Sequence, residues 1–323
     1  MDELIEEVLL RLPPDDPASL ARAALVCRRW RRLISDPCFR RRFRSLHRPP
    51  MLGFVCNIAD TDGPDISRFV PTSSFRPPRA DRRDLRAIDS RHGRVLLCSQ
   101  SVPRPWENGF LVWDPVADED WEVPAPPRHP RWHWNAAVLC AADRGGGCSH
   151  IDCRRDPFLV VFRLSDHTYD EHIDDYFACA PAVLMGGALY FMFHKNTMII
   201  KYDVATLGMS VIHAPNTFYL QNIVLMTTED GRIELVEDSK LYLWSREADP
   251  RGVWGWTVSK VIELKSLLPA DALSRSPEAL GFAECGGFGF ILLWTVNGFF
   301  TIDPKSNQVR NVGVTSGFKD KTR

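Results

Sequence analysis

Four side chains that could bind a metal ion lie close together in the stretch CAADRGGGCSHIDC: Cys140, Cys148, His150 and Cys153. Thiolates and imidazoles are the ligands that zinc prefers in proteins. Their spacing, however, matches none of the common zinc-finger patterns, and the three consecutive glycines are typical of a turn between strands. We therefore predict no metal site, and we expect no cofactor elsewhere in the chain.

Other sequence patterns that could support catalysis or ligand binding are also incomplete. The glycine-rich residues 286–290 are not followed by the helix and Lys-Ser/Thr pair of a phosphate-binding loop. The acidic stretch 166–175 lacks the spacing and central glycine of a calcium loop, and no G-x-S-x-G motif occurs. The histidines and tryptophans of HPRWHW, residues 129–134, favour packing between strands over a recognition surface. We therefore predict no catalytic residues and a protein that is not an enzyme.

The arginines of this chain are concentrated near its N-terminus. Residues 1–48 contain 11 arginines and 7 acidic residues, a net charge of +4, so the remainder carries −1 − 4 = −5. An arginine-rich helix can bind nucleic acid or serve as a nuclear signal. Because no base-reading motif accompanies these arginines, we favour a solvated helix face and predict no nucleic-acid partner.

Apolar residues recur at helical spacing on both sides of Pro13-Pro14. They are Leu4, Ile5, Val8, Leu9 and Leu12 before the prolines, and Leu20, Ala23, Ala24, Cys27, Trp30, Leu33 and Ile34 after them. Asp16 and Pro17 can begin a second helix, and Asp36-Pro37 a third that ends near His47. The pattern predicts three short helices. So small a module cannot bury all its large apolar side chains, so it needs a partner surface.

The rest of the chain consists of short runs rich in β-branched and aromatic residues between Gly, Pro, Asp and Asn. Three segments align as strand, Asp-containing turn and strand: LVWDPVADEDWEVP, IIKYDVATLGMSVIHAP and FFTIDPKSNQVRNV. YLWSREADPRGVWGWTVSKV is a fourth copy with a longer turn, and a glycine begins a strand in HGRVLL, GGALYF, DGRIEL and VNGFFT. At about 45 residues per repeat of four strands, residues 51–318 predict a β-propeller of six blades, with seven as the alternative.

The N-terminal stretch LIEEVLLRLPPDDPASLARAALVCRRWRRLISDPCFRRRF resembles an F-box. The residues that carry the resemblance are Leu12, Pro13, Leu20, Val26, Cys27, Trp30, Leu33, Ile34, Asp36, Pro37 and Phe39. It implies binding to a Skp-type adaptor and, through it, to a cullin-RING ubiquitin ligase. The remainder resembles the F-box-associated propeller of plant, especially grass, F-box proteins, in DSRHGRVLLC, LVWDPVADEDWEVPAPP, IIKYDVATLGMSVI and VIELKSLLP.

The expected architecture is therefore mainly β, with a helical F-box module at residues 1–47 and a connection with the start of the first blade at 48–90. The propeller is expected at 91–318, and a polar tail at 319–323. The resemblance implies these adaptor-binding residues: Leu4, Ile5, Leu9, Leu12, Pro13, Leu20, Val26, Cys27, Trp30, Leu33 and Ile34.

The predicted function is the substrate-recognition subunit of an SCF-type E3 ubiquitin ligase, with a target protein bound by the propeller. The N-terminus is acidic rather than basic, and no apolar run approaches the roughly 18 residues that span a bilayer, so we expect no membrane partner and a cytoplasmic or nuclear location. Two alternatives stay open. One is a degenerate F-box protein that recruits no ligase, since the Leu-Pro pair usual before the first helix is absent, and the other is a propeller-based enzyme.

Overall fold

The computed structural model describes residues 2–13, 17–47, 51–58, 66–99, 109–126, 133–142, 153, 156–165, 181–193, 198–215, 224–227, 233–237, 241–248, 251–285 and 288–313. Several sequence features lie outside these ranges. They are Asp16, the HPRW of residues 129–132, residues 143–152, the acidic stretch 166–175, the glycine of DGRIEL and the tail 319–323.

The N-terminal module contains four α-helices rather than the three expected from the sequence. They are α1 (Asp2–Leu10), α2 (Pro17–Val26), α3 (Arg28–Ser35) and α4 (Pro37–Leu46). The expected second helix is divided at Cys27, whose extended backbone (φ −159°, ψ 164°) ends α2 while its thiol accepts the N–H of Trp30 at 3.5 Å. The expected start at Asp36-Pro37 is confirmed, because Asp36 accepts the N–H of Cys38 at 2.7 Å.

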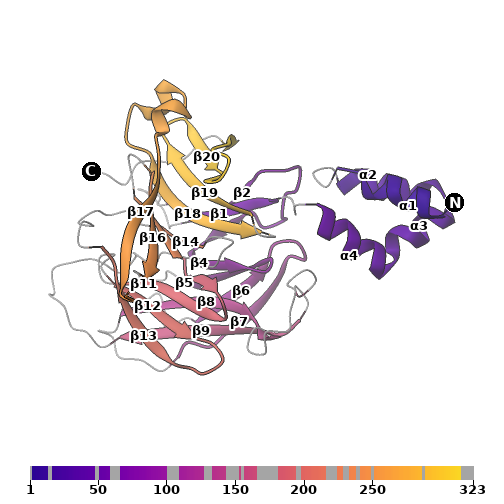
Figure 1. The fold of residues 1–323 in the computed structure, drawn as a ribbon. Coiled ribbons are helices and arrows are strands. Elements are labelled where there is room, and N and C mark those ends of the chain that lie inside the picture. The colour runs from indigo at the N-terminus through magenta and orange to yellow at the C-terminus, as the bar shows by residue number, and fades with distance from the viewer. Residues whose placement is uncertain are drawn as a thin grey trace.

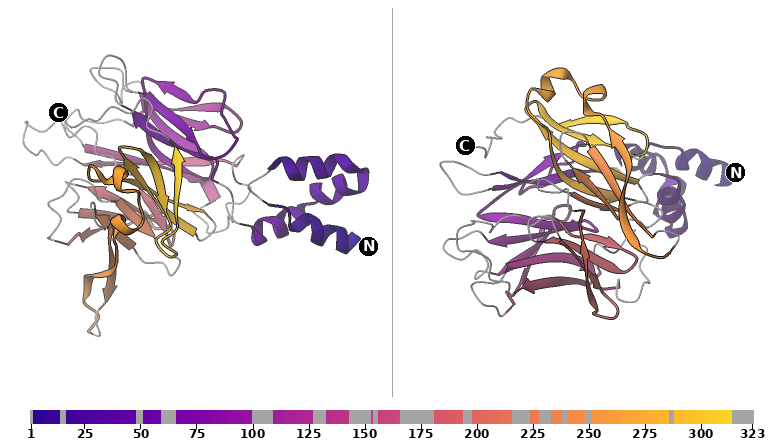
Figure 2. Two further views of the ribbon diagram at one scale, coloured as in Figure 1. Left: turned by 90° about the horizontal axis from the view of Figure 1, so that it is seen from above. Right: turned by 60° about the vertical axis from the view of Figure 1, so that its left-hand side comes forward.

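The four helices share a small apolar core of their own. It consists of the buried side chains of Leu9, Leu10, Ala23 and Phe39. On the surface, Arg42 of α4 forms ion pairs with Glu6 at 2.6 Å and with Glu7 at 3.1 Å, which joins α4 to α1. Figure 1 shows these helices standing to one side of the strands, and the left view of Figure 2 shows the same separation.

Within the described residues, the strands form six antiparallel sheets in chain order, which we call the first to the sixth. The first has three strands, β1 (Gly53–Ile58), β2 (Ile66–Pro71) and β3 (Asp81–Arg83), and the third has two, β8 (His133–Cys140) and β9 (Phe158–Ser165). The second contains β4 (Leu85–Arg91), β5 (Arg94–Ser99), β6 (Phe110–Asp114) and β7 (Glu119–Val123), and the fourth contains β10 (Val183–Met185), β11 (Ala188–Phe193), β12 (Met198–Asp203) and β13 (Met209–His213). The fifth contains β14 (Val224–Thr227), β15 (Ile233–Glu237), β16 (Leu241–Ala248) and β17 (Trp254–Ile262), and the sixth contains β18 (Glu278–Cys285), β19 (Phe288–Thr295), β20 (Gly298–Ile302) and β21 (Val309–Gly313).

The turn between the third and fourth strands is built in the same way in three of these sheets. An aspartate carboxylate accepts the backbone N–H groups two and three residues further on, and the fourth residue after the aspartate has a left-handed backbone. The aspartates are Asp114, Asp203 and Asp303, and the left-handed residues are Asp118, Leu207 and Asn307. The three aligned copies in the sequence therefore correspond to three structurally equivalent hairpins.

Glycine allows the tight turns between neighbouring strands, as the sequence predicts. His92 and Gly93 both have positive φ between β4 and β5, and Gly186 and Gly187 do so between β10 and β11. Two consecutive left-handed residues are the geometry of a two-residue hairpin turn. Gly298, with φ of 137°, begins β20 after the turn from β19. The glycine-start signal is thus confirmed in the three copies that the structure describes.

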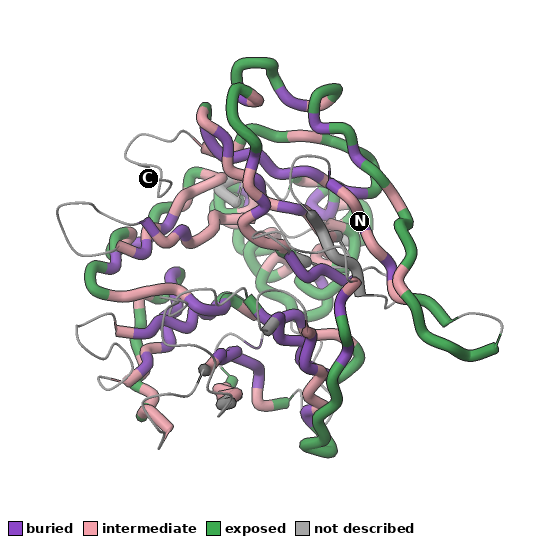
Figure 3. Tube along the Cα trace, turned by 90° about the vertical axis from the view of Figure 1, so that its left-hand side faces the viewer, coloured by how far each residue is buried: buried purple, intermediate pink, exposed green. Residues whose placement is uncertain are grey.

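Apolar clusters pack each sheet against the next one along the chain. Trp113 of the second sheet packs with Phe69 of the first, and Phe110 of the second contacts Phe162 of the third, with ring centroids 4.7 Å apart. Further clusters join the third sheet to the fourth, the fourth to the fifth and the fifth to the sixth. The first and sixth sheets also meet, with the rings of Phe54 and Phe299 5.1 Å apart. Figure 3 shows the buried segments running along the strands.

The chain is therefore mainly β, with an N-terminal helical module and a propeller-like arrangement in which four sheets have the four strands of a blade. The first and third sheets are smaller within the described residues. A short 3₁₀ helix, η4 (Ala270–Leu273), lies between the fifth and sixth sheets along the chain. It packs with Leu264 and Leu268 into the core shared by the fifth and sixth sheets.

Candidate functional site

The residues expected to bind an adaptor fall into three groups by their position in the helical module. Exposed side chains are Leu4, Pro13, Val26 and Cys27, and half-buried ones are Ile5, Leu12, Leu20, Trp30, Leu33 and Ile34. The remaining one, Leu9, is only 1% exposed. The half-buried side chains pack against the helical core and also reach the surface. A small module thus uses the same residues for its own stability and for its outer surface.

Three exposed apolar side chains of the module are missing from the expected set. They are Val8, Leu25 and Leu46. Val8 lies one turn after Leu4 on the same side of α1, which places two exposed aliphatic side chains together. Leu25 is 83% exposed and lies beside Val26 at the end of α2. The sequence did contain a sign that Leu25 is exposed. This leucine falls outside the apolar stripe of its helix, and a side chain there does not face the core.

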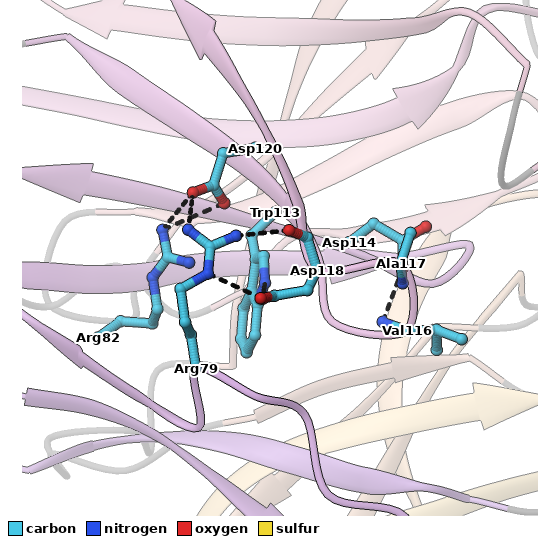
Figure 4. Close-up of polar contacts among 8 residues, drawn as sticks. All are labelled: Arg79, Arg82, Trp113, Asp114, Val116, Ala117, Asp118 and Asp120. Atoms are coloured by element: carbon cyan, nitrogen blue, oxygen red, sulfur yellow. Dashed lines mark hydrogen bonds and ion pairs between the residues drawn. The ribbon is translucent and has the colours of Figure 1, made fainter.

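A cluster of arginines and aspartates joins the first and second sheets (Figure 4). Arg79 contacts both Asp118, at 2.9 Å, and Asp120, and Arg82 of β3 contacts Asp120 at 3.1 Å. The Arg82 guanidinium lies 5.0 Å from the ring centre of Trp113, which is fully buried and donates its indole N–H to Asp118 at 3.2 Å. The hydrogen bonds that Arg79 donates to the carboxylates of Asp120 and Asp118 raise the pKa of Arg79. The opposite charges pair across the contact between the two sheets. The cluster therefore stabilises the packing of the first sheet against the second.

A buried carboxylate occupies the contact between the second and third sheets. Asp89 of β4 accepts the N–H of Val138 on β8 at 2.9 Å and the Nε–H of Arg91 at 3.1 Å. Burial raises the pKa of Asp89, although Arg91 and the backbone N–H groups oppose that shift. Arg91 also donates to the carbonyl of Ala182, just before β10. A raised pKa can mark a catalytic acid, but these hydrogen bonds link three sheets and account for the burial of the carboxylate.

A second exposed apolar surface lies on the outer strands of the fourth and fifth sheets. Its side chains are Leu207, Met209 and Val211 at and in β13, and Val253, Trp254, Val258 and Val261 at and in β17. The two strands are joined where the Trp256 indole donates to the carbonyl of His213 at 2.8 Å. The guanidinium of Arg246 lies 4.8 Å from the ring centre of Trp254. The sequence pattern predicted a strand at β17, but it did not predict which face of that strand is covered.

Among the described residues, no group of three or more His, Cys, Asp and Glu side chains is placed to hold a metal ion. Cys140 and Cys153 of the candidate zinc stretch are buried, whereas Cys148 and His150 lie outside the described residues. Within the same part of the chain, no helix is both long and apolar enough to cross a bilayer.

Comparison with known proteins identifies the helical module. Residues 2–42 match the family model of the F-box domain. The chain is also 29% identical over 140 residues to an F-box protein of Arabidopsis thaliana, a match that covers 38% of this chain and 31% of that protein. The chain thus matches about a third of the length of this curated relative. The chain therefore has an F-box domain at residues 2–42 and is similar over part of its length to a plant F-box protein.

Solved structures similar to this chain are distant from it. A protein from Lactobacillus plantarum has a TM-score of 0.41 at 12% identity, over 80% of this chain and 81% of its own. The extracellular domain of a putative one-component system from B. thetaiotaomicron has a TM-score of 0.34 at 10% identity, over 82% of this chain and 39% of its own.

Proposed function

We propose that this protein is the substrate-recognition subunit of an SCF-type cullin-RING E3 ubiquitin ligase. In this proposal the F-box binds a Skp-type adaptor, and the sheets bind a target protein. The observation that carries it is the F-box match at residues 2–42, on a module that leaves large apolar side chains exposed. The protein then acts without catalytic residues or a cofactor, in the cytoplasm, the nucleus or both.

The exposed aliphatic side chains of the module supply a physical reason for adaptor binding. Leu4, Val8, Leu25 and Val26 are each more than half exposed. Complete burial of one such side chain contributes about 1.5–3 kcal/mol. We propose that these four bind the adaptor together with the half-buried Trp30, and that Leu9 contributes by holding α1 on the core. The expected residues Ile5, Leu12, Pro13, Leu20, Cys27, Leu33 and Ile34 complete the proposed surface.

The order of sheet contacts supports a closed propeller of six blades. Each sheet packs against the next in the chain, and the sixth meets the first through Phe54 and Phe299. A closed ring covers the two sheet faces that an open stack of sheets would leave exposed at its ends. We therefore propose an F-box module at 1–47, a connection and the start of the propeller with its first blade at 48–90, the main part of the propeller at 91–318 and a tail at 319–323.

The proposed mechanism is one of proximity. A receptor that holds its target near a charged ubiquitin-conjugating enzyme turns a bimolecular encounter into an effectively intramolecular one. The chain then needs two binding surfaces at a fixed separation rather than a set of reactive groups. Separate cores for the helices and the sheets are consistent with that division of labour.

Adaptor binding by purified proteins tests this proposal. We expect the unmodified chain to form a complex with a plant Skp-type adaptor in size-exclusion chromatography. The double variant Leu25→Asp, Val26→Asp should lose that complex while keeping its helical circular dichroism, since both side chains are exposed. The double variant Leu207→Asp, Val211→Asp is the matched control, because it places the same two charges on exposed aliphatic side chains of the sheets.

Two results would contradict parts of this proposal. If the unmodified chain and the adaptor do not associate, the F-box is degenerate and the protein recruits no ligase. If the double variant binds as well as the control, the F-box uses another surface and the assignment of these residues is wrong.

A further inference from the structure

Three arginines form a ridge along one side of α3. Arg28, Arg31 and Arg32 are spaced by three and four residues, which places their side chains on a common face. All three are exposed. Trp30, Leu33 and Ile34, on the opposite face of the helix, pack against the helical core. The arginine ridge, defined as Arg28, Arg31 and Arg32, therefore points away from the rest of the module.

Three carboxylates among the described residues of the module are engaged elsewhere. Glu6 and Glu7 form ion pairs with Arg42, and Asp36 accepts a backbone hydrogen bond at the start of α4. Helix α3 itself contains no acidic residue. Like charges at this spacing repel one another and destabilise a helix. The ridge is thus a concentrated positive charge that α3 does not balance.

The ridge continues the exposed apolar surface at the end of α2. Leu25 and Val26 immediately precede the Cys27 cap, and Arg28 is the first residue of α3. Protein interfaces commonly have an apolar centre surrounded by a polar rim, and arginine is enriched in them. Guanidinium groups also pair with carboxylates through two parallel hydrogen bonds. An acidic protein surface would satisfy both the charge and the geometry of the ridge.

We propose that the arginine ridge binds an acidic segment of the Skp-type adaptor and accelerates its association with the F-box. This inference rests on the proposed function. A nucleic acid fits the ridge less well for two reasons. Three arginines on an eight-residue helix can contact only a few phosphates. The residues after 48 carry a net charge of −1 − 4 = −5, which repels a polyanion. Opposite charges chiefly change the rate of association, typically by about 10-fold or more.

The test is the association rate of the full chain with the purified adaptor, measured by stopped-flow at low and high salt. The variant R28Q/R31Q/R32Q should fold normally, because glutamine is a good helix former. We expect its association rate to fall about 10-fold at low salt and to approach that of the unmodified chain at about 0.5 M salt. The dissociation rate should change much less, and R28K/R31K/R32K should recover most of the lost rate.

A matched control removes the same charge from the sheets. R83Q/R251Q/R310Q neutralises three exposed arginines far along the chain from the F-box and should associate like the unmodified protein. An equal loss in this control would overturn the proposal, because net charge alone would then explain the effect. An unchanged rate in R28Q/R31Q/R32Q would overturn it while leaving the proposed function intact.

Two further outcomes separate this inference from the proposed function. If the unmodified chain does not bind the adaptor at any salt concentration, both proposals fail. If R28Q/R31Q/R32Q associates normally with the adaptor but loses binding to a duplex DNA probe that the control retains, the ridge is a phosphate-binding surface and the proposed acidic protein partner is wrong.

Discussion

Replacing Phe39 by alanine should unfold the helical module and leave the sheets folded. Phe39 lies on α4, is 2% exposed and forms the module core with Leu9, Leu10 and Ala23. Its ring also stacks with that of Phe43, at a centroid distance of 6.0 Å. No other fully buried aromatic ring supports this core within the described residues. The substitution therefore removes the largest side chain of a very small interior.

The free-energy cost of the substitution is similar in size to the free energy of unfolding of the module. Replacing a buried phenylalanine by alanine costs about 3–5 kcal/mol. A folded module of about 45 residues has a stability of about 2–7 kcal/mol, at about 0.05–0.15 kcal/mol per residue. The loss thus cancels most or all of the stability of the module. The cores of the sheets consist of other residues and should be unaffected.

Three measurements check this prediction on the full chain. Far-ultraviolet circular dichroism should lose its helical component, limited proteolysis should cut between residues 2 and 47, and the adaptor should no longer bind. The thermal unfolding of the sheets should keep its midpoint. Leu25→Ala is the control, because that side chain is 83% exposed and its loss should change stability by no more than about 0.5 kcal/mol. Retention of helicity and protease resistance by the Phe39 variant would refute the reasoning.

Two other predictions concern buried titratable groups. Because burial raises the folded-state pKa of Asp89, its contribution to stability is present below the unfolded pKa of about 3.9 and is lost as pH rises through the folded value. In urea unfolding, the free energy of unfolding of the Asp89→Asn variant, relative to that of the unmodified chain, should therefore increase from pH 4 to pH 8. A difference between the two proteins that stays constant over this pH range would contradict the prediction. Burial raises the pKa of Cys56 to about 12, so native alkylation with mass spectrometry should modify the exposed Cys27 and Cys38 before Cys56, and equal rates would contradict it.

Features set by local chemistry were predictable from the sequence. The aspartates at the strand ends and the glycines between strands identify hairpins, because an aspartate can accept N–H groups from the following turn and glycine permits positive φ. Asp36-Pro37 likewise predicted a helix start from a side-chain cap and a fixed φ. Each of these signals depends on residues within a few positions of one another.

Features set by contacts between distant segments were not predictable. Arg79 and Asp118 are 39 positions apart and meet only because the first and second sheets lie side by side. The division of the expected second helix at Cys27 also had no signal, since neither glycine nor proline marks it and a thiol is an unusual cap. The periodicity of α1 and α2 indicated apolar faces, but it did not show that Leu4, Val8 and Leu25 would stay uncovered.

The contact between the first and sixth sheets has a consequence for synthesis on the ribosome. The helices are made first and contain a complete core, whereas Phe54 must wait for Phe299, its ring partner in the sixth sheet. At about 5–20 residues per second, that delay is roughly 10–50 s. During this interval the nascent chain already carries folded helices beside unfinished sheets. The N-terminal module can therefore fold and present its exposed apolar side chains before the other end of the protein has been translated.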